Sequence, residues 1–275
     1  KRLKLDASLY TILQILSVTL FEKTSRLGGL MPVAAVVKGR HERLVDYSNY
    51  LSGQLEKLGV DVRTGTEATV EKITALNPDA VIVAVGGATP RPDIKGIDNK
   101  IVMSSDSLHK TLETGLKIFS PYTLRTLGKV YMPVGDKVII IGGHIQGVQL
   151  AEFLSQYDKD ITIVDEEPLE KLGLNMPNYV KERVVLYNQS HGVKTMMGVK
   201  IGEITDEGMT VTTDYGITKT IPADSIIVAL DTVPNSSLVD DLQGLVPAVF
   251  AVGDCAKPGV IVDAVEAGNL TARNI

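Results

Sequence analysis

The sequence predicts an α/β fold built from two nested Rossmann-like domains with parallel sheets. Short apolar runs rich in Val and Ile alternate with helix-length segments through most of the chain, which is typical of parallel α/β sheets. Residues 137–165 run in the order strand, double glycine, helix, strand and acid, as in a dinucleotide-binding βαβ unit. A strand that ends in an acid occurs twice, at 18–22 and 161–165, and each is followed by a buried strand, at 80–87 and 225–231. This repetition indicates two related nucleotide folds, the second inserted into the first.

The composition narrows the class of protein. A chain of 275 residues with 44% apolar residues can form one large or two medium domains with a real core. The net charge of −5 argues against a general nucleic-acid surface. The apolar run at 9–21 is shorter than the ~20 residues of a membrane span, and Glu22 and Lys23 close it. We therefore expect no membrane contact and a buried strand or helix there; a signal-peptide core is the weaker alternative, because no small-residue cleavage site follows.

The cysteine and histidine content predicts neither a disulfide nor a metal site. Cys255 is the single cysteine, which excludes an internal disulfide, a CxxC pair and a cysteine-ligated iron–sulfur cluster within these residues. It is expected to be a small buried hydrophobe. The four histidines lack the spacing of zinc ligands; they are His41, His109, His144 and His191. A reducing cytoplasm is the expected location.

In the first part of the chain, the helix at 39–58 has the clearest pattern. Its apolar and aromatic residues recur at helical spacing, and Gly59 closes it. The run at 80–85 is apolar throughout, so we expect a strand buried on both faces, followed by a loop at 86–92. Short strands are also expected at 17–21 and 60–62.

The second part begins with a linker-like region at 105–136, which contains Pro121 and Pro133. The βαβ unit follows, and Asp206-Glu207-Gly208 has the composition of a hairpin turn. The remaining expectations are helices at 178–191 and 261–274, and strands at 193–197, 201–206, 208–213, 217–221, 225–230 and 249–252.

The glycine turn is the best candidate for a ligand site. Gly142, Gly143 and Gly147 follow a buried strand, and the amides of the next helix would face a pyrophosphate. Asp165, or Glu166 beside it, would bind the ribose hydroxyls, and an acid there favours NAD over NADP. The alternatives are a tight turn without a ligand and a solvated acid at the end of the strand.

One position of the turn departs from the fingerprint. His144 holds the middle position, which is normally a glycine that lets the backbone approach phosphate. Its side chain is expected either to donate to a phosphate or to be a plain loop histidine.

Five segments, spread over nearly the whole chain, carry a family resemblance. They resemble the C-terminal part of multidomain old-yellow-enzyme relatives: 2-enoate reductase, 2,4-dienoyl-CoA reductase and trimethylamine dehydrogenase. The GGxIQG turn is most similar to the 2-enoate-reductase branch. The segments are VTLFEKTSRLGG (18–29), AVIVAVGGATPRPDIKGID (80–98), KVIIIGGHIQGVQLAEFL (137–154), SIIVALDTVPN (225–235) and VFAVGDCAKPGVIVDAVEAGNLTARNI (249–275).

The resemblance implies two cofactors and two domains. Residues 1–115 and 235–275 would form a discontinuous FAD-type domain, and residues 116–234 an inserted NAD(P)-type domain. Glu22 would bind the adenosine ribose of FAD, and the other FAD residues would lie in three loops. These are Arg26, Gly28 and Gly29 along the flavin side, Gly86 and Gly87 near the adenine, and Gly253 and Asp254 at the ribityl and pyrophosphate portion.

The chain also departs from the family pattern. Relatives open with a strand and a G-x-G-x-x-G that holds the FAD pyrophosphate, whereas the residues before Val18 contain no glycine. Either that motif precedes Lys1 or this chain has lost it. The barrel that holds FMN and an iron–sulfur cluster lies outside these residues, and Asp231 replaces a loop glycine.

Two functions follow. The first is the dinucleotide-binding portion of a flavin-dependent NAD(P)H oxidoreductase, in which NADH reduces FAD and electrons pass to a barrel outside the chain. The second is a non-catalytic module that binds ADP-like ligands or nothing. No catalytic side chain is predicted, because flavin and nicotinamide carry such chemistry, and the oligomeric state stays open.

Overall fold

The computed structural model describes residues 16–39, 43–128 and 132–275. The chain forms two compact units, Lys1–Pro78 and Asp79–Ile275, and each is described by itself. The part of the apolar run before residue 16, and His41 in the helix expected at 39–58, lie outside the described residues. The division into FAD-type and NAD(P)-type domains stays a prediction.

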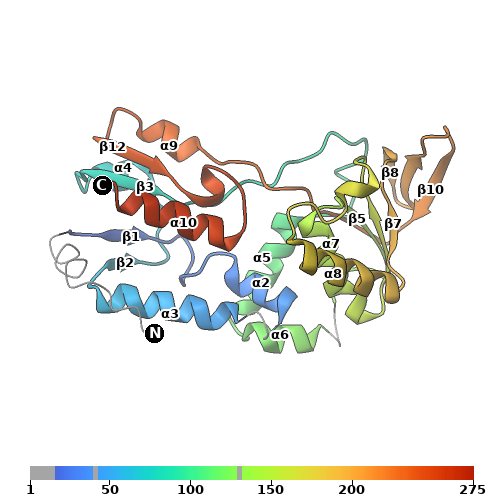
Figure 1. The fold of residues 1–275 in the computed structure, drawn as a ribbon, viewed down its shortest axis with the longest axis horizontal. Coiled ribbons are helices and arrows are strands. Elements are labelled where there is room, and N and C mark those ends of the chain that lie inside the picture. Colours follow the sequence, from blue (N-terminus) through green and yellow to red (C-terminus); the bar gives the residue numbers. More distant parts are fainter. Residues whose placement is uncertain (1–15, 40–42, 129–131) are drawn as a thin grey trace. The chain divides into compact units, whose positions relative to one another are not determined.

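The described residues of the first unit, 16–39 and 43–78, form a short parallel sheet and three helices (Figure 1). Its strands β1 (Thr19–Phe21) and β2 (Asp61–Arg63) pair in parallel. The helices are α2 (Met31–Lys38), α3 (Leu44–Lys57) and α4 (Val70–Thr74). The helix expected at 39–58 is α3, but Tyr50 and Leu51 of its apolar stripe are 58% and 38% exposed. The expected stripe is therefore only partly buried.

In the second unit, β3 (Ala80–Val83) and β12 (Ala248–Ala251) form a two-stranded parallel sheet. The pairing confirms that the last strand returns to the segment near residue 80. Burial of β3 on both faces was wrong, since Ile82 is 41% exposed. The reason is that a two-stranded sheet covers its side chains less completely than a large sheet does.

The larger sheet of the second unit has five parallel strands in the order β4-β11-β5-β6-β7. The βαβ unit expected at 137–165 is confirmed as β5, helix α7 and β6. Residues 138–141 of β5 are at most 1% exposed, as expected for a strand inside a parallel sheet. The strands are β4 (Val102–Ser104), β11 (Ser225–Val228), β5 (Lys137–Ile141), β6 (Asp160–Val164) and β7 (Lys194–Met196).

The linker expected over 105–136 is wrong, because two helices occupy much of it: α5 (Ser105–Leu116) and α6 (Pro121–Leu127). The Ser104 and Ser120 hydroxyls cap these helices by accepting the amides of residues 107 and 123, each at 3.1 Å. Pro121 stands in the first turn, where a missing N–H costs nothing. Pro121 therefore marks the start of a helix, whereas Pro133 lies in a bend before β5.

Strand β4 was not expected. It lies beside β11 in the large sheet, although the predicted division assigned residues 102–104 to the other domain.

An antiparallel sheet follows β7, in the order β10-β9-β8. It confirms the expected hairpin and third strand; the strands are β8 (Lys200–Thr205), β9 (Gly208–Thr212) and β10 (Thr218–Pro222). Met209 and Val211 are fully buried and pack in one cluster with Ile139 and Ile226 of the large sheet. This shared core holds the two sheets together.

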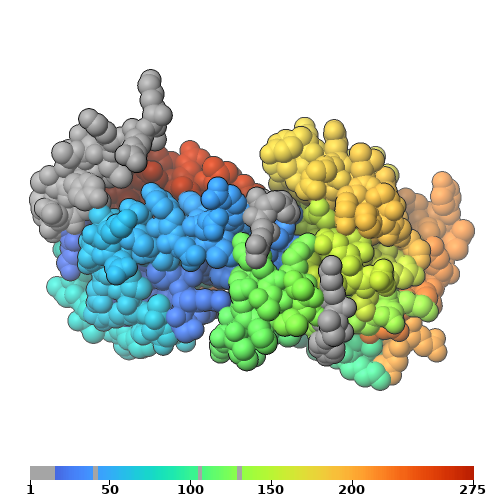
Figure 2. All heavy atoms as spheres, turned by 90° about the horizontal axis from the view of Figure 1, so that it is seen from below, coloured from blue at the N-terminus to red at the C-terminus, as the bar shows by residue number. Residues whose placement is uncertain are grey.

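The remaining helices are α7 (Ile145–Leu154), α8 (Asn178–Ser190), α9 (Ser237–Leu242) and α10 (Ile261–Ala272), with short 3₁₀ turns at Ser155–Tyr157, Leu169–Lys171 and Gly253–Cys255. The outer side of α8 forms part of the surface, in yellow in Figure 2, and its Tyr179 and Leu186 are 78% and 64% exposed.

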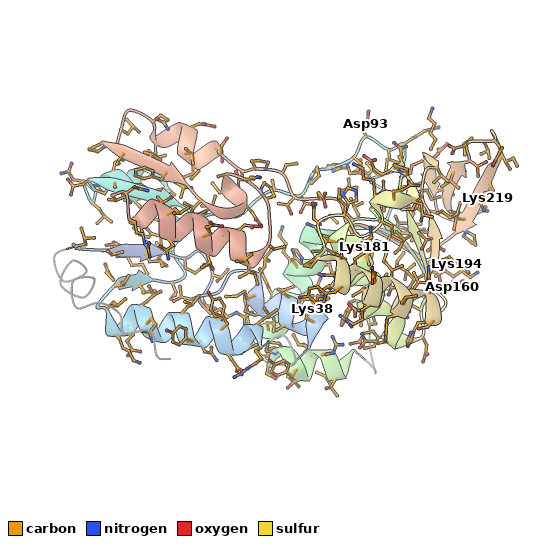
Figure 3. All side chains as sticks on the ribbon, in the orientation of Figure 1. Lys38, Asp93, Asp160, Lys181, Lys194 and Lys219 are labelled. Carbon is orange, nitrogen blue, oxygen red and sulfur yellow. The ribbon has the colours of Figure 1, made fainter. Side chains whose placement is uncertain are left out.

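At the start of β6 and β7, Lys194 donates to both oxygens of Asp160 at 2.7 and 2.9 Å (Figure 3). Among the described residues, no helix is both long and apolar enough to span a membrane.

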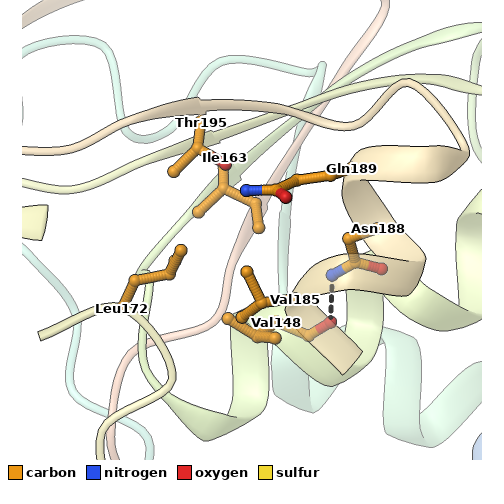
Figure 4. A pocket seen from close by; sticks show the side chains of 7 residues that line it. All are labelled: Val148, Ile163, Leu172, Val185, Asn188, Gln189 and Thr195. Carbon is orange, nitrogen blue, oxygen red and sulfur yellow. Dashed lines mark hydrogen bonds between the residues drawn. The ribbon is translucent and has the colours of Figure 1, made fainter. Parts of the chain in front are cut away.

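A small pocket lies between α7, α8 and the large sheet (Figure 4). Asn188 lines it and donates from Nδ2 to the Val148 carbonyl oxygen at 3.0 Å, which ties α8 to α7. The pocket's volume is about 10 Å³, room for roughly one water molecule. It is therefore a packing defect and not a nucleotide site.

Candidate functional site

The candidate site lies where β5 and β11 end side by side. The two strands are parallel and in register at Ile141 and Val228, and the Ala229 amide donates to the Ile141 carbonyl at 2.8 Å. Strand order reverses here, because β6 lies on one side of β5 and β11 on the other. Loops that leave the carboxyl ends of strands at such a point form the crevice in which open α/β sheets bind nucleotides.

Two glycines of the turn are required by close contacts. Gly142 has φ +117°, and a Cβ there would stand 2.4 Å from the Ala229 carbonyl oxygen. A Cβ on Gly147 would stand 1.8 Å from the Gly142 carbonyl oxygen. The structure therefore brings Gly142, Gly143 and Gly147 together in one tight turn. These contacts are those that the first and third glycines of a dinucleotide fingerprint make possible.

The start of α7 can hold an anion. Within the described residues, the backbone amides of Gln146 and Gly147 donate to no protein acceptor. Free amides at a helix N-terminus favour phosphate. Two neighbouring amides are already used, since Ile145 donates to the Leu174 carbonyl at 3.1 Å and Gly143 donates to Asp165.

Contacts distinguish the two acids considered for the ribose. Asp165 accepts from the Gly143 amide at 2.6 Å through Oδ2 and from the Glu167 amide at 2.9 Å through Oδ1. Glu166 instead accepts from the Ile201 amide at 2.9 Å, next to the start of β8. Asp165 thus faces the turn, and each of its oxygens keeps a further lone pair for a ribose hydroxyl.

The two departures from the family pattern are in contact. His144 Nδ1 and Asp231 Oδ2 lie 2.6 Å apart, joining the glycine turn to the loop after β11. Beside this pair, Gln146 Nε2 donates to Thr232 Oγ1 at 3.1 Å. Sequence reasoning flagged His144 and Asp231 one at a time and missed their pairing, because no local signal links residues so far apart in the chain.

The first unit holds four of the residues expected at FAD. Glu22 stands directly after β1, and its Oε1 accepts from the Thr24 amide at 2.7 Å. Arg26, Gly28 and Gly29 follow in the same loop. A Cβ on Gly28 would stand 2.4 Å from the Ser48 Oγ, so this glycine lets the loop pack on α3. Glu22 and the loop that follows it are therefore held in a defined conformation at the end of β1.

The second unit brings the other FAD candidates together at the ends of β3 and β12. The Val252 amide donates to the Val83 carbonyl at 3.0 Å, and a Cβ on Gly87 would stand 3.4 Å from the Asp254 carbonyl oxygen. Gly86 and Gly253, both with positive φ, complete this pair of loops. Asp254 Oδ1 accepts from the Gly259 amide at 3.0 Å, which shapes the entry to α10.

Cys255 lies in the same region and is fully buried. Its thiol donates to the Asn235 carbonyl at 3.1 Å. Burial raises the pKa of the Cys255 thiol, against the smaller opposing effect of a hydrogen bond with the backbone of Val85. A protonated, shielded thiol is a poor nucleophile.

The described residues fit one cofactor more completely than the other. The turn at 142–147 has two unused amides with Asp165 beside it, the kinds of group that bind the pyrophosphate and the ribose of a nicotinamide dinucleotide. For FAD, the acid Glu22 and the strand-end loops are present, whereas a glycine turn for its pyrophosphate does not occur in residues 16–39. In the part of the chain that the structure describes, no group of three His, Cys, Asp or Glu side chains is arranged to hold a metal ion.

The chain is similar to known proteins that are much longer than its 275 residues. The chain is similar to NADH oxidase of Thermoanaerobacter brockii, at 27% identity over 94% of this chain and 37% of that protein. It is similar to bilirubin reductase of Mediterraneibacter gnavus, at 29% identity over 93% of this chain and 36% of the relative. Its fold matches a 2-naphthoyl-CoA reductase structure with a TM-score of 0.77 and 27% identity, over 94% of this chain and 36% of the other.

The chain therefore spans little more than a third of these relatives. The family model of pyridine nucleotide-disulphide oxidoreductases matches residues 17–268. That match covers most of the chain, including the glycine turn at 142–147 and the loop after β11. The chain belongs to the pyridine nucleotide-disulphide oxidoreductase family, whose fold binds FAD and NAD(P)H.

Proposed function

We propose that the chain is the dinucleotide-binding portion of a larger flavin-dependent reductase, in which NADH delivers hydride to a flavin. The observation that carries the proposal is the glycine turn at a switch point with Asp165 hydrogen-bonded to it. The family and its NADH oxidase and bilirubin reductase relatives support the same chemistry. The relatives' greater length supports a further part, which we propose is a barrel with FMN and an iron–sulfur cluster.

Each group of the site has a proposed task toward the nucleotide. The amides of Gln146 and Gly147 bind the pyrophosphate, and Asp165 accepts from the ribose hydroxyls. Carboxylates at 165, 166 and 167 repel a 2′-phosphate, so NADH is preferred over NADPH. When bound, the nicotinamide supplies the hydride.

The FAD-type residues have the roles that the resemblance implies. Glu22, Arg26, Gly28 and Gly29 hold one part of FAD, and Gly86, Gly87, Gly253 and Asp254 hold another. We also propose the nested division, 1–115 with 235–275 around 116–234, and a cytoplasmic location. A 2-enoate or dienoyl-CoA type of substrate belongs to the larger protein.

The test is calorimetry with NADH and NADPH on two matched variants. Asp165→Asn removes the charge that faces the ribose and is expected to weaken NADH binding about tenfold or more, since hydrogen bonds to charged groups contribute most. Glu166→Gln keeps an acceptor for the Ile201 amide and is expected to leave NADH affinity unchanged. Equal losses in both variants would contradict the assignment of the ribose to Asp165.

The flavin part has its own test. After incubation with FAD, the protein is expected to retain flavin absorbance that NADH bleaches. Protein that stays colourless but binds ADP supports a second candidate, a module for ADP-like ligands without redox chemistry. The His144–Asp231 contact across the crevice favours this second candidate.

A further inference from the structure

We propose that the hydrogen bonds His144–Asp231 and Gln146–Thr232 form a lock between the glycine turn after β5 and the loop after β11. The lock admits the adenylate half of a dinucleotide and excludes the nicotinamide half until it opens. The inference rests on the proposed nucleotide site and adds a device that controls entry to it.

The direction of a bound dinucleotide follows from the strand order. Asp165 follows β6, the turn follows β5, and Asp231 lies in the loop after β11, so the three stand in sequence along the carboxyl edge of one sheet. With the ribose at Asp165 and the pyrophosphate at the start of α7, the rest of the molecule continues toward β11. The next feature on that path is the His144–Asp231 contact.

Both bonds join the same two chain segments. His144 and Gln146 belong to the turn and the first residues of α7, while Asp231 and Thr232 belong to the loop after β11. The 2.6 Å contact to a carboxylate is the shorter of the two, as in charge-assisted hydrogen bonds. His144 is 18% exposed and Asp231 is 40% exposed at the side chain, so water competes only partly for the bond.

The loop that carries the lock is held in place from its other side. The Ala88 and Val233 backbones exchange hydrogen bonds at 2.9 and 2.8 Å. A Cβ on Gly87 would stand 2.1 Å from Thr232 Cγ2, so the loop after β3 and the loop after β11 are in close contact there. Because the loop is braced, the lock opens more readily by rotation of the His144 and Asp231 side chains than by movement of the backbone.

The state of the imidazole favours a lock over a permanent phosphate ligand. His144 Nε2 is shielded from solvent and has no hydrogen-bond partner among the described residues. A nitrogen that binds phosphate in the closed arrangement would instead be open to the crevice. The unpartnered nitrogen also makes opening easier, because rotation of the ring lets water or a phosphate satisfy it.

The test compares ADP with NADH by calorimetry on the full 275-residue chain and its variants. In His144→Ala and Asp231→Ala, NADH affinity is expected to rise about tenfold, since each removes a hydrogen bond that the ligand must break. ADP affinity is expected to stay within about twofold, because ADP ends before the lock. The double variant is expected to match either single variant, as both act on one bond.

Asp240→Ala is the matched control. It also removes a carboxylate that accepts a side-chain hydrogen bond, from Ser236 at 2.9 Å, but away from the crevice. Its NADH and ADP affinities are expected to equal those of the parent. Circular dichroism tests whether each variant is folded. If His144→Ala unfolds, Asp231→Ala tests the same hydrogen bond at a more exposed side chain.

The outcomes separate the two proposals. If ADP binds but the variants leave NADH affinity unchanged, the lock is wrong and the nucleotide site stands. If the variants weaken NADH binding, the pair is a ligand clamp and the lock is again wrong. If neither the parent nor any variant binds ADP or NADH, the nucleotide site itself is refuted, and the lock with it.

Discussion

Gly147→Ala is expected to destabilise the protein although alanine is the better helix former. The added Cβ would stand 1.8 Å from the Gly142 carbonyl oxygen and 2.9 Å from the Gly142 carbonyl carbon. Both atoms belong to backbone in a buried turn, so neither can rotate away. Helix α7 must therefore shift by about 1.2 Å or more relative to the turn.

The magnitude follows from two opposing effects. Overpacking of a well-packed site costs about 1–3 kcal/mol or more, whereas glycine to alanine inside a helix contributes roughly 1 kcal/mol of stability. A contact this short lies at the costly end, so the free energy of unfolding is expected to fall by about 2 kcal/mol. NADH affinity is expected to fall with it, because the shift moves the amides that face the pyrophosphate.

Urea unfolding measures the effect, with Gly268→Ala as the control in the same unit. Gly268 lies inside α10, and a Cβ there would meet no atom within 4 Å. Its substitution is expected to raise the free energy of unfolding by about 0.5–1 kcal/mol. If the free energy of unfolding changes in the same direction in both variants, the close contact at Gly147 is not the cause. This comparison requires that the dependence of that free energy on urea concentration is the same in both variants.

Two further predictions concern buried polar groups. Asn188→Ala is expected to lower the free energy of unfolding by about 0.5–1.5 kcal/mol, because the bond from Asn188 Nδ2 to the Val148 carbonyl is lost while the unpartnered Asn188 Oδ1 is removed with it. The exposed neighbour Gln189, changed to alanine, is expected to have little effect in the same urea titration. Since burial raises the pKa of the Cys255 thiol, the folded chain keeps this proton at a pH at which the unfolded chain loses it. Stability is therefore expected to fall as the pH rises above about 8.5. Cys255→Ala is expected to remove that part of the slope in thermal melts, and an unchanged slope would show that the thiol does not cause it.

The βαβ unit was predictable because its signals are local. The run at 138–141 is too apolar for anything but a buried strand, and Gly142 and Gly147 stand at the spacing that a strand–turn–helix needs. The structure confirms the elements and supplies the reason for each glycine as a distance to a neighbouring carbonyl. The family membership follows from the same segments.

In the region at 105–136 the prediction of a linker is wrong. Proline is common in linkers, but Ser120 before Pro121 caps a helix and proline is well suited to the first turn. Ser104 caps α5 in the same way. The caps were visible in the sequence, and in α5 Leu108, Leu112 and Leu116 also recur at helical spacing.

Local composition decided which segments become strands, helices and glycine turns, because backbone sterics and apolar spacing act over a few residues. It did not decide which loops meet. The order β4-β11-β5 places residues 229–233 beside the glycine turn, and this order alone brings Asp231 to His144. It is also tertiary contact that directs Asp165 to the turn and Glu166 to β8. Pairing between distant strands depends on packing across the whole sheet, and no window of neighbouring residues contains that information.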